Sequence, residues 1–277
     1  MSASEHIQLA LAKARGEATP LLSPTAERVS PPLVRSAEQS PPPARTWSGL
    51  RTAVVDPRLA RKNRLVTMHR SDPAHVSFDI LRTRIHQMMQ RGGWKTVAIT
   101  SPGPDCGKSS VSLNLAFSLA HQSDFRVALV DLDLRRPSIA HKLGMPNPPV
   151  LSEFLSGRAE VEDVFVRYGD NIAIAANARP ADLPAELLQS AQAASAFASI
   201  KRKLQPDLII FDLPPYLETD DVQGFLPNAD CTVLIVAADL STKAQIDECE
   251  RQLASSTNLL GVVLNACRYA TSSGYPT

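Results

Sequence analysis

The sequence predicts an α/β fold in which a doubly wound, mostly parallel sheet is flanked by helices. Continuous apolar runs at 95–100, 126–131 and 208–211 are typical of strands that are buried on both faces. Segments with helical spacing of apolar residues separate these runs, and this alternation favours a parallel sheet. A chain of 277 residues with 44% hydrophobic content is long enough for one such core and some additional tail.

The chain before residue 71 is expected to lie outside that core. A capping-box spacing and one apolar face predict a short amphipathic helix over 1–16. The following stretch is rich in Pro, Ser, Ala and Arg and ends in a basic run, which predicts a disordered linker over 17–70. Such a composition buries too little apolar surface to offset the entropy of ordering the chain. The folded domain is expected over 71–269, followed by a short polar tail over 270–277.

Within the domain, the first helix is predicted to begin at Asp72-Pro73 and to end at Gly92-Gly93. Apolar residues at helical spacing between these signals support it. The remaining elements are predicted in chain order as a strand at 95–100, a helix at 111–120, a strand at 126–131, a short element at 151–155, a strand at 171–175, a short segment at 184–188, a helix at 191–204, strands at 208–211 and 231–236, a helix at 242–254 and a strand at 260–264.

Composition excludes several classes of protein. The net charge of +1 offers no argument for binding nucleic acid. No apolar run approaches the roughly 20 residues of a membrane-spanning helix, and no signal peptide opens the sequence. The cysteines have no metal-ligand spacing, so free thiols in a reducing cytoplasm are expected at Cys106, Cys231, Cys249 and Cys267.

A glycine-containing turn joins the first predicted strand to the helix that follows it. Such a turn presents backbone N–H groups at the open end of a helix, where they bind phosphate oxygens. Lys108 would lie over the β- and γ-phosphates and the Ser109 hydroxyl would ligate Mg²⁺, although Pro102 stands where the usual pattern has its first glycine. The residues expected to contact the nucleotide are Gly103, Pro104, Asp105, Cys106, Gly107, Lys108, Ser109 and Ser110.

Aspartates end two of the other buried strands. Asp131 ends the run at 126–131 and Asp133 follows it, and Asp212 follows the run at 208–211. Because ligands collect at the carboxyl ends of parallel strands, these carboxylates are expected at the same edge as the phosphate-binding turn. A lysine, a hydroxyl and three carboxylates in one crevice favour nucleotide chemistry over packing.

Three motifs together resemble those of the bacterial tyrosine kinases of exopolysaccharide and capsule biosynthesis, a branch of the deviant P-loop ATPases related to MinD and ParA. The resemblance extends from about Ser71 to Tyr269. Its motifs are Ser101-x-x-Pro104-x-x-Gly107-Lys108-Ser109, Val130-Asp131-Leu132-Asp133-Leu134-Arg135-Arg136-Pro137 and Phe211-Asp212-Leu213-Pro214-Pro215.

The resemblance implies roles for these residues with ATP and Mg²⁺ as cofactors. Lys108 and Ser109 would bind phosphate and metal, and Asp212 would hold the metal through water. Asp131 and Asp133 match the motif in which one carboxylate supports both the metal and the attacking tyrosine, and Asp131 is favoured as base or metal partner because it is closest to the strand end.

Further positions are assigned through the same resemblance. Asn265 matches an amide that contacts adenine, with a strand-end cap as the alternative, and Asp221 matches an aspartate that follows the third motif. Arg135 and Arg136 would neutralise charge in the transition state, or at least one of them would form a surface salt bridge. Asp105 stands where the family usually has glycine, so its carboxylate would face the bound phosphates and reduce nucleotide affinity unless it points outward. If the position requires positive φ, Asp would also cost about 1 kcal/mol more than glycine.

The implied function is that of an ATP-dependent protein tyrosine (auto)kinase that regulates polysaccharide synthesis or export. Its partner would be a membrane-embedded polysaccharide co-polymerase or chain-length regulator on a separate chain, which places the protein in the cytoplasm at the inner face of the plasma membrane. A homo-oligomer is also implied, although only Arg82 of the family's three charged ring-assembly residues is present. The expected phosphoacceptors are Tyr269 and Tyr275, with Tyr168 and Tyr216 as alternatives.

Two other functions remain open. One is a MinD/ParA-like ATPase switch without kinase activity, which the absence of that group's lysine at Gly103 disfavours. The other is a non-catalytic scaffold that binds nucleotide weakly or not at all, which Asp105 and the small number of tyrosines favour. Lys108, Asp131 and Asp212 argue against the scaffold.

Overall fold

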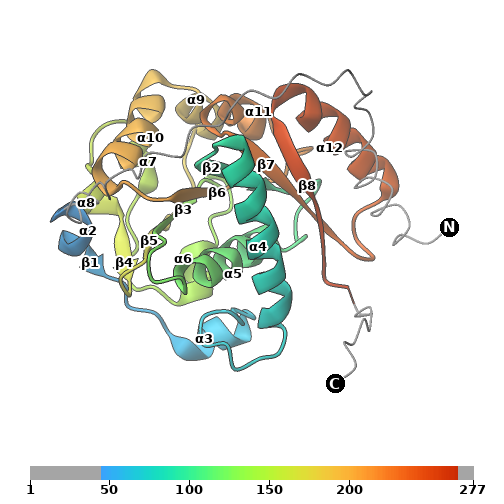
Figure 1. Cartoon of the computed structure of the whole chain (residues 1–277). Helices are drawn as coiled ribbons and strands as arrows, with labels where there is room; N and C mark the ends of the chain where they lie inside the picture. Colours follow the sequence, from blue (N-terminus) through green and yellow to red (C-terminus); the bar gives the residue numbers. More distant parts are fainter. Residues whose placement is uncertain (1–44, 268–277) are drawn as a thin grey trace, which may run out of the picture. The chain divides into compact units, whose positions relative to one another are not determined.

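The computed structural model describes residues 45–267 (Figure 1). The helix expected over 1–16, the linker as far as residue 44, and the tail with Tyr269 and Tyr275 lie outside the described residues. The described part forms one sheet in the order β1-β4-β5-β3-β6-β2-β7-β8. Its strands are β1 (Arg51–Thr52), β2 (Thr96–Thr100), β3 (Val127–Asp131), β4 (Val166–Tyr168), β5 (Ile172–Ala175), β6 (Leu208–Asp212), β7 (Cys231–Ala237) and β8 (Asn258–Asn265).

The sheet is parallel except where β4 and β5 pair in antiparallel fashion. Strand β2 lies between β6 and β7, and β6 lies between β3 and β2. The carboxyl ends of β3, β6 and β2 therefore meet at one edge, as the apolar runs predicted. The predicted fold class, a doubly wound and mostly parallel sheet flanked by helices, is confirmed.

Helices cover both faces of the sheet (Figure 1). One apolar layer, which includes Val97, Ile99 and Leu129, packs under α4 and α5; the other, which includes Ala98, Val130 and Phe211, packs under α10, α11 and α12. The helices are α2 (Arg45–Gly49), α3 (Pro57–Lys62), α4 (His75–Gly92), α5 (Lys108–Ala120), α6 (Ile139–Leu143), α7 (Leu151–Leu155), α8 (Val161–Val164), α9 (Pro184–Leu188), α10 (Ala191–Leu204), α11 (Asp221–Phe225), the 3₁₀ turn η1 (Leu226–Asn228) and α12 (Lys243–Ser256).

Residues 45–70 belong to the folded unit, which corrects the linker expected over 17–70 for its described part. Trp47 and Leu50 are only 3% and 4% exposed and join the core. Strand β1 pairs with β4, and Asp56 caps α3 while its N–H donates to the Leu143 carbonyl. Residues 45–70, called the strap below, therefore pack against the rest of the domain.

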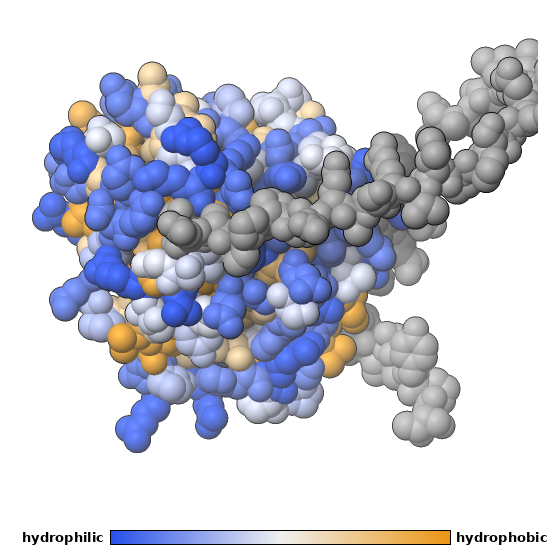
Figure 2. Space-filling view, turned by 60° about the vertical axis from the view of Figure 1, so that its left-hand side comes forward, coloured by the Kyte–Doolittle hydropathy of each residue, from blue (hydrophilic) through white to orange (hydrophobic). Residues whose placement is uncertain are grey.

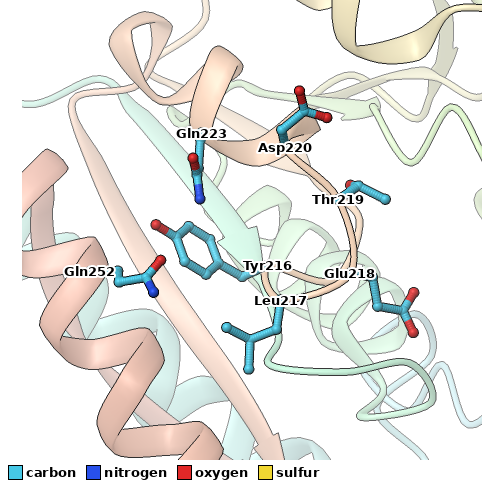
Figure 3. Close-up of a pocket in the computed structure, with 7 residues that line it drawn as sticks. All are labelled: Tyr216, Leu217, Glu218, Thr219, Asp220, Gln223 and Gln252. Carbon is cyan, nitrogen blue, oxygen red and sulfur yellow. The ribbon is translucent and has the colours of Figure 1, made fainter.

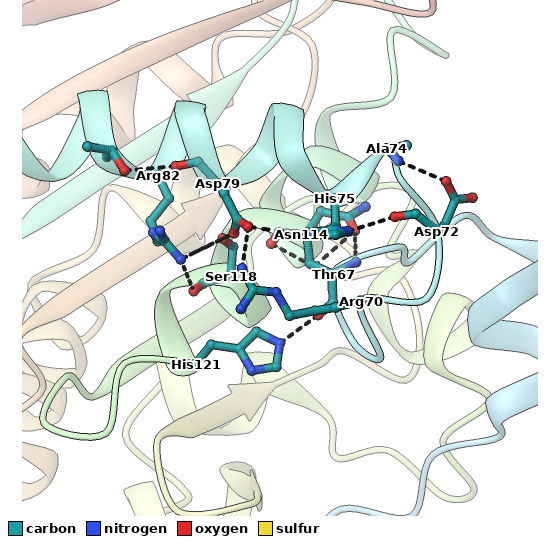
Figure 4. Close-up of polar contacts among 11 residues, drawn as sticks. Thr67, Arg70, Asp72, Ala74, His75, Asp79, Arg82, Asn114, Ser118 and His121 are labelled. Atoms are coloured by element: carbon teal, nitrogen blue, oxygen red, sulfur yellow. Dashed lines mark hydrogen bonds and ion pairs between the residues drawn. The ribbon is translucent and has the colours of Figure 1, made fainter. Parts of the chain in front are cut away.

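The strap is fixed to α5 by a buried amide (Figure 4). Asn114 is 1% exposed, and its Oδ1 accepts bonds from Thr67 N and Oγ1 at 3.1 and 3.0 Å. Its Nδ2 donates to the carbonyls of Arg64 and Ser110. All the hydrogen-bonding capacity of this side chain is therefore used in joining the strap to α5 and to the start of that helix.

Helix α4 begins later than the sequence predicts. The Asp72 carboxylate accepts a bond from Ala74 N at 2.9 Å, which forms a local turn before the helix begins at His75. The end is as predicted, because Gly93 adopts φ 67° as the C-cap.

Asp79, which occupies one of the family's other two charged ring-assembly positions, is bonded within the chain (Figure 4). Its carboxylate binds Ser118 Oγ at 2.6 Å, Arg82 Nη1 at 3.2 Å and the guanidinium of Arg70. Burial opposes its ionisation, but the Ser118 hydroxyl and both arginines outweigh that effect and hold the pKa of Asp79 below its ordinary value. The contacts of Asp79 and Arg82 with Ser118 therefore join α4 to α5.

On the face drawn in Figure 2, hydrophobic residues are scattered among polar ones. Isolated apolar side chains of this kind are normal on a folded surface. Within 45–267, none of the helices is both long enough and apolar enough to traverse a bilayer.

Candidate functional site: a phosphate-binding loop beside three carboxylates

Three carbonyl groups of the loop between β2 and α5 already accept hydrogen bonds within the protein. Ser101 O accepts from Tyr216 N at 2.7 Å, and Pro102 O accepts from Leu217 N at 3.3 Å. Gly103 O accepts from Ser101 Oγ at 2.6 Å. Because these carbonyls already have donors, the backbone N–H groups of the loop remain for a ligand, and such N–H groups bind anions.

Two loop residues adopt left-handed backbone conformations. Gly107 has φ 85° as the N-cap of α5, and Asp105 has φ 57°. The position of Asp105 therefore does require positive φ, which costs an aspartate about 1 kcal/mol relative to glycine. Asp105 is exposed, whereas the neighbouring Cys106 is 2% exposed and turns its thiol toward Ser241 Oγ, 3.4 Å away.

Asp131 and Asp212 are direct partners on adjacent strands β3 and β6. Both are fully buried, and each has one carboxylate oxygen without a partner, Oδ1 of Asp131 and Oδ2 of Asp212. The other oxygen of Asp131 accepts from Ser138 N and Ile139 N at the start of α6, and Asp212 Oδ1 accepts from Ser112 Oγ at 3.0 Å. Two adjacent buried carboxylates with unused oxygens are a feature that calls for a cation.

Lys108 supplies one cation to this group. Its Nζ lies 2.7 Å from Asp133 Oδ2, and the two side chains are 13% and 2% exposed. The other oxygen of Asp133 accepts from Arg136 N at 2.9 Å. Both oxygens of Asp133 therefore accept a hydrogen bond, whereas one of the two oxygens of Asp131 has no partner.

The electrostatics follow from burial and proximity. Burial, and then the neighbouring Asp212, raise the pKa of Asp131 well above its ordinary value. Burial also raises the pKa of Asp212, although Lys108 and the hydroxyls of Ser109 and Ser112 oppose it. Burial disfavours the ammonium of Lys108, but Asp212 and Asp133 outweigh this effect and raise the lysine pKa.

The residues present fit a magnesium ion. Mg²⁺ prefers hard oxygen ligands, commonly one or two carboxylates with waters and substrate phosphates. The unpartnered oxygens of Asp131 and Asp212 supply such ligands. The Ser109 hydroxyl, which opposes the rise of the Asp212 pKa, would supply a third.

Both arginines after Asp133 form ion pairs. Arg135 donates through Nε and Nη2 to the two oxygens of Asp221 at 2.8 and 2.9 Å, and Asp221 is 1% exposed. Arg136 pairs with the exposed carboxylate of Glu218.

The predicted site residues are largely brought together, with Lys108, Ser109, Asp131, Asp133 and Asp212 in one cluster. Asn265 lies beyond the loop at the end of β8 and donates from Nδ2 to Cys106 O at 2.9 Å.

Sequence reasoning missed two polar residues at the site. Ser112 lies one helical turn after Lys108, so a polar residue at that spacing on an otherwise buried helix was the available signal. Lys142 on α6 is half-buried, and burial lowers its pKa while Asp212 and Asp105 oppose that shift. No pattern in the sequence indicated the second lysine.

The two tyrosines named as alternative acceptors differ in exposure. Tyr216 is 3% exposed, and Figure 3 shows its hydroxyl pointing toward Gln223 and Gln252 in a pocket of about 380 Å³. Burial raises the pKa of its phenol. Tyr168 is half-buried and packs edge to face on Phe117, with ring centroids 5.5 Å apart.

Loop, lysine and strand-end carboxylates together define a P-loop nucleotide-binding protein. A family model for the CobQ/CobB/MinD/ParA nucleotide-binding domain matches residues 97–274, and the chain belongs to this family.

Relatives within this superfamily carry kinase names. The chain is 31% identical over 217 residues to the tyrosine-protein kinase ptk of Acinetobacter johnsonii, covering 76% of this chain and 28% of that protein. It is 28% identical over 232 residues to the tyrosine-protein kinase YwqD of Bacillus subtilis, covering 78% of this chain and 94% of that protein. The chain thus spans just over a quarter of ptk and most of YwqD.

Solved structures agree with this. The kinase domain of Escherichia coli tyrosine kinase ETK superposes with a TM-score of 0.66 at 28% identity, covering 77% of this chain and 84% of that one. The predicted resemblance to bacterial tyrosine kinases of the P-loop fold is confirmed.

Proposed function

We propose that this chain is an ATP-dependent protein tyrosine kinase that phosphorylates tyrosines of its own sequence, on itself or on a second copy. The observation that carries the proposal is the placement of Lys108 against three buried strand-end carboxylates in a chain whose relatives are named tyrosine-protein kinases. Transfer of a phosphoryl group is mostly positioning and charge neutralisation, and this cluster supplies both.

In the proposed mechanism, the backbone N–H groups of the loop at 103–110 bind the ATP phosphates, and Lys108 neutralises the β- and γ-phosphates. The ammonium is already held in place by Asp133, so little ordering is required when phosphate arrives. Ser109, Asp131 and Asp212 would hold Mg²⁺, which supplies charge neutralisation at the phosphates when bound.

The proton of the incoming tyrosine needs an acceptor. Asp131 has a free buried oxygen, whereas both oxygens of Asp133 are engaged by Lys108 and Arg136 N. Its raised pKa makes the ionised Asp131 carboxylate more basic than an ordinary aspartate. These contacts favour Asp131 as the base or metal partner, with Asp133 as the residue that positions Lys108.

The biological setting of the proposal follows the resembled family. The kinase would regulate exopolysaccharide or capsule synthesis from the cytoplasmic face of the membrane, through a separate membrane-embedded co-polymerase or chain-length regulator. A homo-oligomer would have to use contacts other than the family's charged ones, because Asp79 and Arg82 are bonded within the chain.

The test is incubation of the purified chain with Mg·ATP, alone and with cytoplasmic segments of candidate membrane partners. Phosphotyrosine is mapped by mass spectrometry, and free phosphate is measured in parallel. We expect phosphotyrosine that is lost in Lys108→Met and largely lost when Tyr269 and Tyr275 are replaced by Phe. Tyr168→Phe serves as the matched control, because its half-buried ring is expected to leave the signal unchanged.

Other outcomes separate the alternatives. Phosphate release without phosphotyrosine would favour an ATPase switch. Neither product under any condition would favour a non-catalytic scaffold.

A further inference from the structure

The side chain of Asn265 contacts the phosphate-binding loop at the Cys106 carbonyl. Its backbone is held firmly, because Asn265 is paired with Ala237 across β7 and β8 and its carbonyl accepts from Ala238 N at 3.0 Å. From this fixed position Nδ2 donates to Cys106 O at 2.9 Å. The end of strand β8 is therefore bonded directly to the loop.

This bond fixes the orientation of one peptide group. A trans peptide is planar, and its C=O and N–H point in opposite directions. Within 45–267 every peptide bond is trans, so the Cys106 carbonyl that faces Asn265 directs the Gly107 N–H to the other side of the loop. Gly107 is the N-cap of α5, so this N–H belongs to the open end of a helix, where backbone N–H groups bind phosphate oxygens.

The fit between Asn265 and Gly107 is close. Gly107 has φ 85°, and a Cβ added to it would lie 2.2 Å from Asn265 Nδ2. The amide thus occupies the space that any larger residue at 107 would need. A rotation of Asn265 away from the loop would leave Cys106 O without this donor.

We propose that Asn265 is a positioning residue for the phosphate-binding loop, which it holds with the Gly107 N–H directed at a polyphosphate anion. The chemical class that it serves is the polyphosphate of the nucleotide rather than the base. The inference rests on the nucleotide site of the proposed function but not on tyrosine phosphorylation.

The test compares three ligands by isothermal titration calorimetry in the presence of Mg²⁺: ATP, GTP and inorganic tripolyphosphate. Asn265→Ala removes one neutral hydrogen bond from the loop, so we expect it to weaken tripolyphosphate and ATP by the same factor, about two- to tenfold. The ratio of ATP to GTP affinity is expected to stay at the wild-type value. Asn265→His, which can present a ring N–H near the position of Nδ2, is expected to recover part of the tripolyphosphate affinity.

Asn258→Ala is the matched control. Asn258 lies at the opposite end of the same strand, and its Nδ2 donates to the Asp230 carbonyl at 2.8 Å. This variant also loses one side-chain bond to a backbone carbonyl. Comparing the thermal unfolding of the two alanine variants therefore shows whether a change in affinity follows from lost stability or from the position of the loop. We expect Asn258→Ala to bind all three ligands as the wild type does.

The proposal is overturned if Asn265→Ala binds tripolyphosphate as tightly as the wild type while ATP weakens, because the side chain then contacts the base. It is also overturned if the Asn258→Ala control weakens tripolyphosphate equally. A wild-type chain that binds none of the ligands refutes the nucleotide site itself, whereas one that binds them without forming phosphotyrosine refutes only the kinase.

Discussion

Replacing Lys108 by Met is expected to lower stability as well as activity, because the lysine is the counter-charge of buried carboxylates. Asp133 is 2% exposed and lies 2.7 Å from the ammonium, and Asp131 and Asp212 are fully buried beside it. Breaking a buried pair by removing one partner typically costs about 3–5 kcal/mol.

Protonation sets an upper limit on that cost. Neutralising one aspartate of ordinary pKa takes about 5 kcal/mol at about pH 7.5 but only about 2 kcal/mol at about pH 5.5. We therefore expect Lys108→Met to be less stable than the wild type by about 3–5 kcal/mol at the higher pH and by no more than about 2 kcal/mol at the lower.

Urea denaturation without metal or nucleotide, at both pH values, measures this difference. The double variant Lys108→Met, Asp133→Asn removes both partners and should be more stable than Lys108→Met alone. Lys203→Met is the control, because Lys203 contacts two exposed carboxylates, Glu160 at 2.8 Å and Glu162 at 2.9 Å, and should change stability by at most about 1 kcal/mol at either pH. A loss in Lys108→Met that is equal at the two pH values would refute the reasoning.

Three further predictions concern single side chains. Because folding raises the pKa of Asp131, the folded protein binds the carboxyl proton more tightly than the unfolded chain does, and the wild type loses stability as pH rises. Asp131→Asn should therefore gain stability relative to the wild type between about pH 5 and pH 8, as measured by urea titrations with EDTA. A stability difference between the two that does not change with pH would contradict this. Trp47→Ala should lower the free energy of unfolding by about 3–5 kcal/mol in the same assay, whereas a strap outside the core would give almost no change. Arg135→Ala should lower the free energy of unfolding by about 2–3 kcal/mol, less than for a fully buried pair because Arg135 is 43% exposed. Arg136→Ala should lower it by at most about 1 kcal/mol, and equal losses in the two variants would show that the two ion pairs do not differ.

The central strands and the carboxylates at their ends could be predicted because buried parallel strands are continuous apolar runs. β2, β3 and β6 lie within a residue or so of the predicted positions, and Asp131 and Asp212 end their strands as expected. Residue type and strand order are sufficient to bring these groups to one edge. Nothing in a strand pattern specifies which carboxylate Lys108 contacts, because that depends on side-chain rotamers.

The strap could not be predicted from composition. Its contribution to the core rests on a few apolar residues such as Trp47 and Leu50 within a polar, Arg-rich stretch, and β1 is only two residues long. Averages over such a window resemble those of a disordered linker. The start of α4 was misplaced for a local reason, since the Asp72 carboxylate bonds to Ala74 N and forms a turn before the helix.

The contacts of the two arginines separate the roles that the resemblance assigned to them jointly. Arg135 uses both its Nε and Nη2 on Asp221, so turning it toward a phosphate would leave a buried carboxylate unpaired. Arg136 has a different partner, because Glu218 is 36% exposed and water can replace the arginine there. The salt-bridge alternative therefore fits Arg135, and we propose Arg136 as the arginine whose guanidinium exchanges its partner for a phosphate. The backbone of Arg136 meanwhile holds Asp133, which in turn holds Lys108, so the same residue can neutralise charge without releasing the carboxylate that positions the lysine.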